Sequence, residues 1–128
     1  MSDPTYETGM RVRREVLGDE HVDAAVAGTS GFTRPFQDYL TRSAWGEVWA
    51  RPGLDRRTRS CVALAVLAAL GRTDEIPMHV RAARRHGLEP SEIAEVLLQT
   101  AVYAGVPAAN AAFKVADATL RASEAGED

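Results

Sequence analysis

The chain has 128 residues with a formal net charge of −3, and its 45% hydrophobic and 26% charged residues are typical of a globular protein rather than a disordered one. This length predicts one domain, residues 1–128, that buries about two-thirds of the surface of its unfolded chain. The acidic balance argues against a nucleic-acid partner held by electrostatics. The single cysteine, Cys61, excludes an intrachain disulfide, and no apolar signal peptide precedes the first charged residues, so a cytoplasmic location is expected.

The first part of the chain has the pattern of three helices. Apolar residues at helical spacing predict an amphipathic helix over residues 6–17, followed by a shorter helix that Asp19 caps. After a glycine-containing loop, Thr33 is expected as the N-cap of a third helix, residues 35–49, with Pro35 in its first turn. Both tryptophans of the protein lie on this third helix.

An apolar segment, residues 60–70, organises the rest of the chain. Residues 61–70 contain no polar side chain, so a helix formed by them must be surrounded by protein. The segment is about half as long as the roughly 20 residues that a membrane span needs, which favours a core helix and argues against a membrane partner. Gly71 is expected to end this helix, and Thr73 is expected to cap the next one.

The helix that Thr73 is expected to cap contains His79 and is expected to end at Gly87. Two further helices follow it. In residues 90–104 the apolar side chains recur at i, i+3, i+4 and i+7, which is the pattern of a helix with one buried face. Glu89 takes the N-cap position and Glu92 the N3 position of this helix. A Gly-Val-Pro break then leads into a last helix, residues 107–122.

No four consecutive residues alternate in the manner of a strand, so the sequence predicts an all-α fold of about six helices. Residues 1–5 and 123–128 are expected to be disordered ends. A chain this small has few elements of its own to cover the apolar segment 61–70, which favours a homo-oligomer. The alternative is that the helices of one chain suffice to cover it.

Glu75 and His79 are the first candidates for catalysis. They are four residues apart and share one face of the predicted helix. An imidazole ordinarily titrates near pH 6.5, so an imidazole with a carboxyl group one turn away can transfer protons near neutral pH. The alternative is a purely structural histidine and a charge of the sign that helix starts favour.

Several short runs of sequence together resemble the carboxymuconolactone decarboxylase family. In the second half these are Leu54-Asp55-Arg56-Arg57-Thr58-Arg59-Ser60, Leu70-Gly71, His79, Gly87-Leu88, Glu92-Ile93, Glu95-Val96 and Tyr103-Ala104-Gly105-Val106-Pro107-Ala108. In the first half, Gly18-Asp19-Glu20, Phe32-Thr33-Arg34-Pro35 and Trp45-Gly46 look like the decarboxylases proper and less like the wider superfamily. The resemblance covers nearly the whole chain. It implies an all-helical, alkylhydroperoxidase D-like fold, a cofactor-free enzyme and a ring-shaped homo-oligomer, commonly a hexamer, with active sites near subunit contacts.

Another branch of this superfamily, similar to alkylhydroperoxidase D, carries CxxCxxxH on the same hairpin and an acidic residue on the preceding helix. When His79 is matched to that histidine, Arg72 and Glu75 stand at the two cysteine positions and Ser60 at the acidic position. Peroxide reduction requires a thiolate, so this activity is not expected here. Cys61, within the apolar segment, is expected to be a small buried hydrophobe.

The activity that the resemblance implies is decarboxylation of 4-carboxymuconolactone to 3-oxoadipate enol-lactone in aromatic-acid breakdown. The electrons left by the departing CO2 flow through the conjugated double bond to the lactone carbonyl, so the substrate supplies its own electron sink. The protein must hold an anionic lactone, stabilise charge on the lactone oxygen and protonate a ring carbon. His79 is the expected proton donor and Glu75 its partner, although the two roles can be exchanged.

Four further residues are candidates for binding the substrate. Arg34 and Arg72 are the expected carboxylate ligands. Trp45 either forms a dry wall of the pocket or is an ordinary core residue, and Tyr103 either donates its hydroxyl to the lactone oxygen or packs. Arg81, Arg84 and Arg85 are interpreted as a solvated helix face, and the cluster Arg51, Arg56, Arg57 and Arg59 as surface or interface. His21 and His86 are interpreted as surface residues.

Three other functions stay open. The same acid–base chemistry suits a related lyase or isomerase that acts on another lactone or keto acid. A non-enzymatic helical oligomer would use Glu75 and His79 only for capping and packing. A peroxidase-like protein that lacks the CxxC motif is the least favoured.

Overall fold

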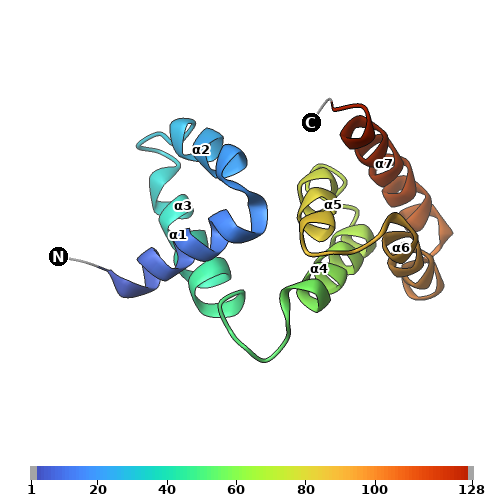
Figure 1. The fold of residues 1–128 in the computed structure, drawn as a ribbon, viewed down its shortest axis with the longest axis horizontal. Coiled ribbons are helices and arrows are strands. Elements are labelled where there is room, and N and C mark those ends of the chain that lie inside the picture. Colours follow the sequence, from blue (N-terminus) through green and yellow to red (C-terminus); the bar gives the residue numbers. More distant parts are fainter. Residues whose placement is uncertain (1–2, 127–128) are drawn as a thin grey trace. The chain divides into compact units, whose positions relative to one another are not determined.

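The computed structural model describes residues 3–126, and every regular element in that range is a helix (Figure 1). Seven of these are α-helices and one, η1, is a π-helix. The all-helical prediction is confirmed, with more elements than the six or so that were expected. The chain divides into two compact units, Met1–Arg56 and Arg57–Asp128, and the expectation of a single domain stays a prediction. No helix within residues 3–126 is both long and apolar enough to cross a membrane.

The N-terminal unit contains α1 (Pro4–Leu17), α2 (Asp19–Ala27), α3 (Arg34–Leu40) and η1 (Thr41–Val48). The first helix begins earlier than predicted because the Asp3 side chain accepts a hydrogen bond from the Tyr6 N–H at 3.1 Å. Gly18, with a φ of 90°, separates α1 from α2, as its position in the sequence predicts. Thr33 is the N-cap residue of α3 as expected, but its side chain makes no capping bond to the helix.

The third predicted helix, residues 35–49, is not one regular α-helix. It changes at Thr41 into η1, whose wider turns include a bond from the Trp49 N–H to the Ala44 carbonyl five residues earlier, at 2.9 Å. The packing of η1 against α1 is unusually close. A Cβ atom on Gly9 would lie 2.0 Å from the Thr41 carbonyl oxygen, and one on Gly46 would lie 2.6 Å from the Thr5 carbonyl oxygen. Two glycines therefore allow the two backbones to touch.

The C-terminal unit contains α4 (Arg56–Leu70) from its second residue onward, α5 (Ile76–Arg85), α6 (Pro90–Ala104) and α7 (Val106–Glu124). Helices α5, α6 and α7 pack on one another, and α4 adds Leu64 and Ala68 to the same core. The core is built from fully buried aliphatic side chains that recur at helical spacing: Leu64, Ile76, Val80, Leu88, Ile93 and Leu97. Ile93 and Leu97 are among the apolar positions on which the prediction of the helix over residues 90–104 rested, and Leu64 lies in the predicted apolar segment.

The start of α5 differs from the prediction. Thr73 does not cap it: residues 73–75 form a turn, and the helix begins at Ile76 with Glu75 as the N-cap residue. Pro77 explains this boundary, because a proline lacks the N–H group that an interior helical position needs and is favoured in the first turn. Gly71 has a φ of 72°, the left-handed conformation expected of a residue that ends a helix.

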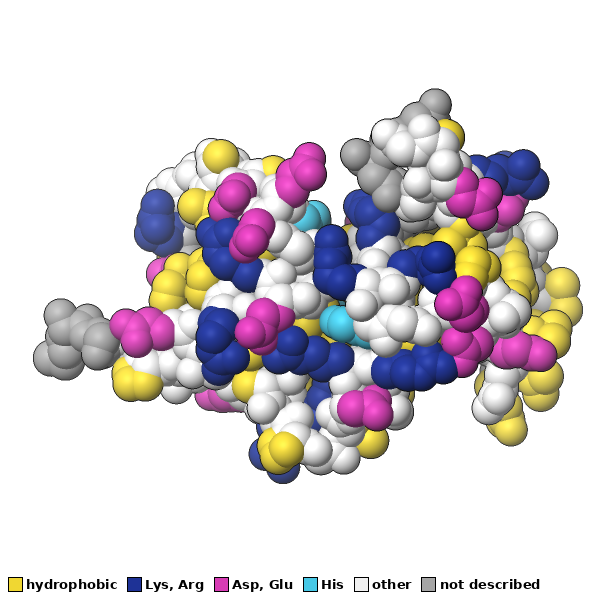
Figure 2. Space-filling view, viewed as in Figure 1, with side chains coloured by type: hydrophobic (Ala, Val, Ile, Leu, Met, Phe, Trp, Pro, Cys, Tyr) yellow, Lys and Arg dark blue, Asp and Glu magenta, His cyan; other side chains and the backbone are white. Residues whose placement is uncertain are grey.

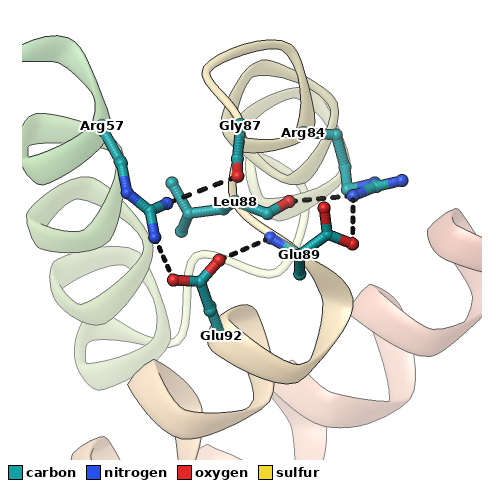
Figure 3. A network of polar contacts seen from close by, with 6 residues as sticks. All are labelled: Arg57, Arg84, Gly87, Leu88, Glu89 and Glu92. Atoms are coloured by element: carbon teal, nitrogen blue, oxygen red, sulfur yellow. Dashed lines mark hydrogen bonds and ion pairs between the residues drawn. The ribbon is translucent and has the colours of Figure 1, made fainter.

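A network of polar contacts joins α4 to the start of α6 (Figure 3). Glu92 accepts a hydrogen bond from the Glu89 N–H at 2.9 Å, which completes the predicted capping box. This backbone hydrogen bond, helped by the charge of Arg57, holds the pKa of Glu92 below its ordinary value. Arg57 also pairs with Glu92 and reaches the Gly87 carbonyl, while Arg84 bonds the Leu88 carbonyl at 3.0 Å. The loop between α5 and α6 is thus bonded on both sides.

Both ends of the chain are more ordered than expected over the part that the structure describes. Asp3, Pro4 and Thr5 already belong to the cap and first turn of α1, and α7 continues to Glu124. For residues 1–2 and 127–128, the expectation of disorder lies outside the described residues.

Candidate active site

Three of the predicted site residues lie on the turn that leads into α5 and on its first turn, linked by backbone hydrogen bonds. The Glu75 N–H donates to the Arg72 carbonyl at 3.1 Å, and the His79 N–H donates to the Glu75 carbonyl at 3.4 Å. Arg72, Glu75 and His79 therefore follow one another along a continuous backbone path at the start of the helix. Glu75 and His79 are one turn apart, but Glu75 precedes α5 as its N-cap residue and does not lie in the helix as predicted, and the acid–base role of the two stays a prediction.

The side chains of this cluster differ sharply in environment. His79 is buried, with 9% of its surface exposed, between the core residues Ile76 and Val80. Glu75 and Arg72 are exposed. The carboxylate of Glu75 is attached at the N-terminus of α5, where the helix dipole favours a negative charge. The cluster thus combines a buried imidazole with an exposed carboxylate and an exposed guanidinium.

A second histidine was wrongly interpreted from the sequence. His86, expected at the surface, is half-buried, and its Nδ1 lies 2.9 Å from the Oγ of Ser60, which is fully buried. This bond ties the end of α5 to α4. Ser60 is the residue at the position where the peroxidase branch has an acid, so that position holds a histidine-bonded hydroxyl here. No local pattern reveals the pair, because its members are 26 residues apart.

Two predicted substrate-binding residues belong to the N-terminal unit. Trp45 is 6% exposed, and its ring lies 5.2 Å from that of Trp49 at an interplanar angle of 30°. This packing favours the core interpretation of Trp45. Arg34 is the first residue of α3 and is exposed, as a ligand for a soluble anion needs to be.

Tyr103, the remaining predicted residue, lies at an apolar groove between α4 and α6. The groove has a volume of about 430 Å³, and its walls include Cys61, Val62, Val66 and Thr100. Tyr103 is 84% exposed, so within one chain it does not pack in the core. Cys61 lines the groove and is only partly buried, contrary to the prediction.

The helix expected to be surrounded by protein is covered on one side only. Ser60, Leu64 and Ala68 of α4 are buried, whereas Val62 is 50% exposed and Val66 and Leu70 are also exposed. Helix α6 also exposes large apolar side chains, Leu98, Val102 and Tyr103, and Tyr103 lines the same groove as Val62 and Val66. Figure 2 shows hydrophobic side chains reaching the surface over α6 and α7. An apolar surface of this kind is typical of a binding interface.

Residues 3–126 contain no group of three or more His, Cys, Asp and Glu side chains placed to hold a metal ion.

The protein is all-helical, and it carries a buried histidine, His79, at the start of α5, the helix that follows the apolar helix α4. Comparison with known proteins identifies the family of helical proteins to which it belongs. The model of the carboxymuconolactone decarboxylase family matches residues 34–118, and the chain belongs to this family. The matched residues include α3 to α6 and most of α7, and so include every predicted site residue.

Three characterised relatives are similar to the chain. A 4-carboxymuconolactone decarboxylase of Acinetobacter baylyi is 47% identical over 116 residues, which cover 91% of this chain and 87% of the relative. A nitrosuccinic acid decarboxylase of Metarhizium robertsii is 40% identical over 115 residues, which cover 90% of this chain and 80% of the relative. A 4-carboxymuconolactone decarboxylase sequence of Pseudomonas putida is 48% identical over 42 residues, or 33% of this chain and 88% of the relative.

Proposed function

We propose that this protein is a carboxy-lyase that converts 4-carboxymuconolactone into 3-oxoadipate enol-lactone during the breakdown of aromatic acids. The observation that carries the proposal is the 47% identity, over nearly the whole chain, with an enzyme named for that reaction. The two near-full-length relatives are both decarboxylases, which supports a carboxy-lyase over the non-enzymatic and peroxidase alternatives. The substrate is an anionic small molecule.

The reaction breaks the bond between the ring carbon and its carboxylate carbon. The bonding electron pair moves through the conjugated double bond onto the lactone carbonyl oxygen while CO2 leaves. A proton is then added to a ring carbon as the electrons return from the oxygen. Because the substrate stores the electron pair, the protein needs only to orient the carboxylates, stabilise the oxygen and supply a proton.

His79 is proposed as the proton donor and Glu75 as the group that recharges or orients it, or with these roles exchanged. Support comes from their positions one turn apart at the start of α5 and from the burial of His79, which keeps water away from the proton-transfer step. Arg72, on the same turn, and Arg34 are proposed to bind carboxylates of the substrate. Trp45 and Tyr103 stay proposals for the pocket wall and for the lactone oxygen.

The proposal is tested by NMR of the purified protein with freshly prepared 4-carboxymuconolactone in deuterium oxide. Wild type should form the enol-lactone with deuterium at a ring carbon. Removing a general acid typically costs about 10²–10⁴-fold in rate, so His79→Ala and Glu75→Gln should be slower, the proton donor by the larger factor. Arg81→Met, which removes a charge from α5 away from the turn, serves as the control. If wild type does not exceed the uncatalysed rate, the proposed reaction is wrong.

The relative from Metarhizium robertsii supports a second candidate substrate. Nitrosuccinic acid, for which that relative is named, also bears carboxylates, and a nitro group can accept the electron pair that a lactone carbonyl accepts in the first reaction. The same acid, base and anion-binding groups would serve both. A panel of lactones, nitro acids and keto acids, ranked by kcat/KM, decides between them.

We further propose that the protein assembles as a homo-oligomer, in the hexameric form that the family resemblance implies. The exposed apolar residues of α4 and α6 support this proposal, because a second copy of the chain offers the same apolar surface for self-complementary burial. Assembly would complete the cover that α4 lacks within one chain.

A further inference from the structure

Arg13 is a buried arginine to which no role has been assigned. It lies on α1 with 6% of its surface exposed, and its guanidinium group faces α3 and η1. One terminal nitrogen donates to the Thr41 Oγ1 at 3.4 Å and the other to the Gln37 Oε1 at 3.3 Å. Both acceptors are neutral, and both bonds are long. Arg13 stands in a run of charged residues typical of an exposed helix face, so no local pattern predicts its burial.

The charge of Arg13 has no compensating charge among the described residues. Four other arginines of the N-terminal unit, Arg11, Arg14, Arg42 and Arg56, each pair with a carboxylate within 4 Å, but Arg13 pairs with none in residues 3–126. Its Nε is buried and makes no hydrogen bond. Burial lowers the pKa of Arg13, which reflects the same cost of removing the cation from water. Burying an unpaired charge is costly, so such residues are ordinarily found with a counter-ion.

The geometry specifies what kind of counter-ion is missing. The Nε–H has no acceptor, and each terminal nitrogen carries two hydrogens, of which the bonds to Thr41 and Gln37 use one, so the guanidinium retains N–H donors for a further acceptor. A planar carboxylate can accept from two guanidinium donors with its two oxygens. Thr41 donates its own proton to the Gln37 carbonyl at 2.7 Å, so its oxygen is held as an acceptor for Arg13. Thr41 is also the first residue of η1, and π-helical turns are frequent at functional sites.

We propose that Arg13, held in place by Gln37 and Thr41, binds a carboxylate group of a small polycarboxylic acid. This inference rests on the proposed function in one respect only, which is that the substrate of that reaction is such an acid. It adds a substrate-binding residue to the ones expected from the sequence, Arg34 and Arg72, both of which are exposed. Arg13 should discriminate between anions more strongly than Arg34 and Arg72 do, because it is buried. A desolvated guanidinium favours a carboxylate that accepts from its donors over an ion that keeps its hydration shell.

The test uses tricarballylate as a non-reacting probe and measures thermal unfolding of the full chain. Sodium chloride at the same ionic strength is the reference. Wild type should be stabilised by the probe, because a ligand that binds only the folded state raises the unfolding temperature. In Arg13→Met the affinity for the probe should fall by about 10- to 100-fold, as the loss of a hydrogen-bonded charge predicts. Without the probe, this variant should unfold at or above the wild-type temperature, because an apolar side chain replaces an uncompensated charge.

Two further variants keep the result decisive. Arg11→Met removes a charge from the exposed side of the same helix and should respond to the probe as wild type does. Arg13→Lys keeps the charge but loses the guanidinium donors, so it should fold and still bind the probe more weakly than wild type. The proposal is overturned if wild type gains no more from tricarballylate than from salt, or if both Arg13 variants retain the full gain. Because no turnover is measured, failure of the lactone reaction would refute the proposed function and leave this site standing.

Discussion

At the scale of single residues, the polar side chains discussed above differ in whether they are buried or exposed. His79, Ser60, Thr41 and Arg13 are buried, whereas Glu75 and Arg72 are exposed. Burying a polar group without a hydrogen bond costs free energy, so a buried polar side chain is expected to have a hydrogen-bonding partner in the protein or a ligand. Ser60 meets this need with His86, and Arg13 meets it only in part.

The bond between Ser60 and His86 is expected to contribute to stability. Replacing Ser60 by Ala removes its hydrogen bond with the His86 Nδ1 in a half-buried position, which should lower the free energy of unfolding by about 1–3 kcal/mol. Urea unfolding followed by circular dichroism measures this change. Ser91→Ala, on an exposed position of α6, is the matched control and should stay within about 0.5 kcal/mol of wild type.

A double-mutant cycle with His86→Gln separates the bond from the packing of each side chain. If the two substitutions prove additive, the hydroxyl and the imidazole do not interact in solution, and the contact between α4 and the end of α5 is explained by packing alone.

At the scale of helices, local sequence signals determine some helix boundaries, and close packing between helices determines others. The capping box of α6 follows from Glu89 and Glu92, residues close enough in sequence to find each other whatever the fold. The start of α5 follows from Pro77 and not from Thr73. The change from α3 to η1 has no such local signal: it occurs where α1 lies against the backbone at Thr41 and Gly46.

The close packing of α1 on η1 is expected to be intolerant of any side chain at Gly9. The Cβ atom of Gly9→Ala would lie 2.0 Å from the Thr41 carbonyl oxygen, so one of the two helices must move. Overpacking of this kind typically costs about 1–3 kcal/mol, and the contact with rigid backbone places Gly9→Ala at the upper end. The measurement is the midpoint of thermal or urea unfolding.

Gly28→Ala is the control for this substitution. Its Cβ atom would come no closer than 3.5 Å to the atoms around it, and Gly28 has an ordinary helical conformation, so the change should be neutral or slightly stabilising. Equal effects of the two substitutions would show that the Gly9 contact is looser in solution than in the structure.

At the scale of the whole molecule, the exposed apolar surface of α4 and α6 is the dominant feature. Val62, Val66 and Leu70 lie on one helix and Val102 and Tyr103 on the other, and Val102 is 77% exposed. Exposing this much apolar area is unfavourable for a chain that stays monomeric in water. The exposed apolar residues of α4 and α6 therefore support the proposed homo-oligomer.

A charge placed in this surface is expected to break the assembly. Val102→Glu should move the protein to a lower molar mass in size-exclusion chromatography with light scattering, because a carboxylate would have to be buried without a partner. Ala118→Glu, on an exposed position of α7, should leave the mass unchanged. A wild-type protein that runs as a monomer would contradict the proposed oligomer, and an unchanged mass for Val102→Glu would place the interface elsewhere.

The helical class, most helix boundaries and the capping box at Glu89 and Glu92 could be predicted from the sequence alone. Each of these depends on residues no more than a few positions apart, where glycines, prolines, caps and apolar spacing act before any tertiary contact forms. Family resemblance supplied the expected reaction, and the comparisons confirmed the family.

Only the tertiary structure decided the rest: the bond of Ser60 to His86, the π-helical turns of η1, the uncovered side of α4 and the burial of Arg13. The bond from Arg13 to Thr41 joins residues 28 positions apart, and that from Ser60 to His86 joins residues 26 apart. Whether a polar side chain is exposed or buried depends on which helix packs over it. The hydrophobic pattern of a single helix shows which side turns inward, but not which distant groups meet it there.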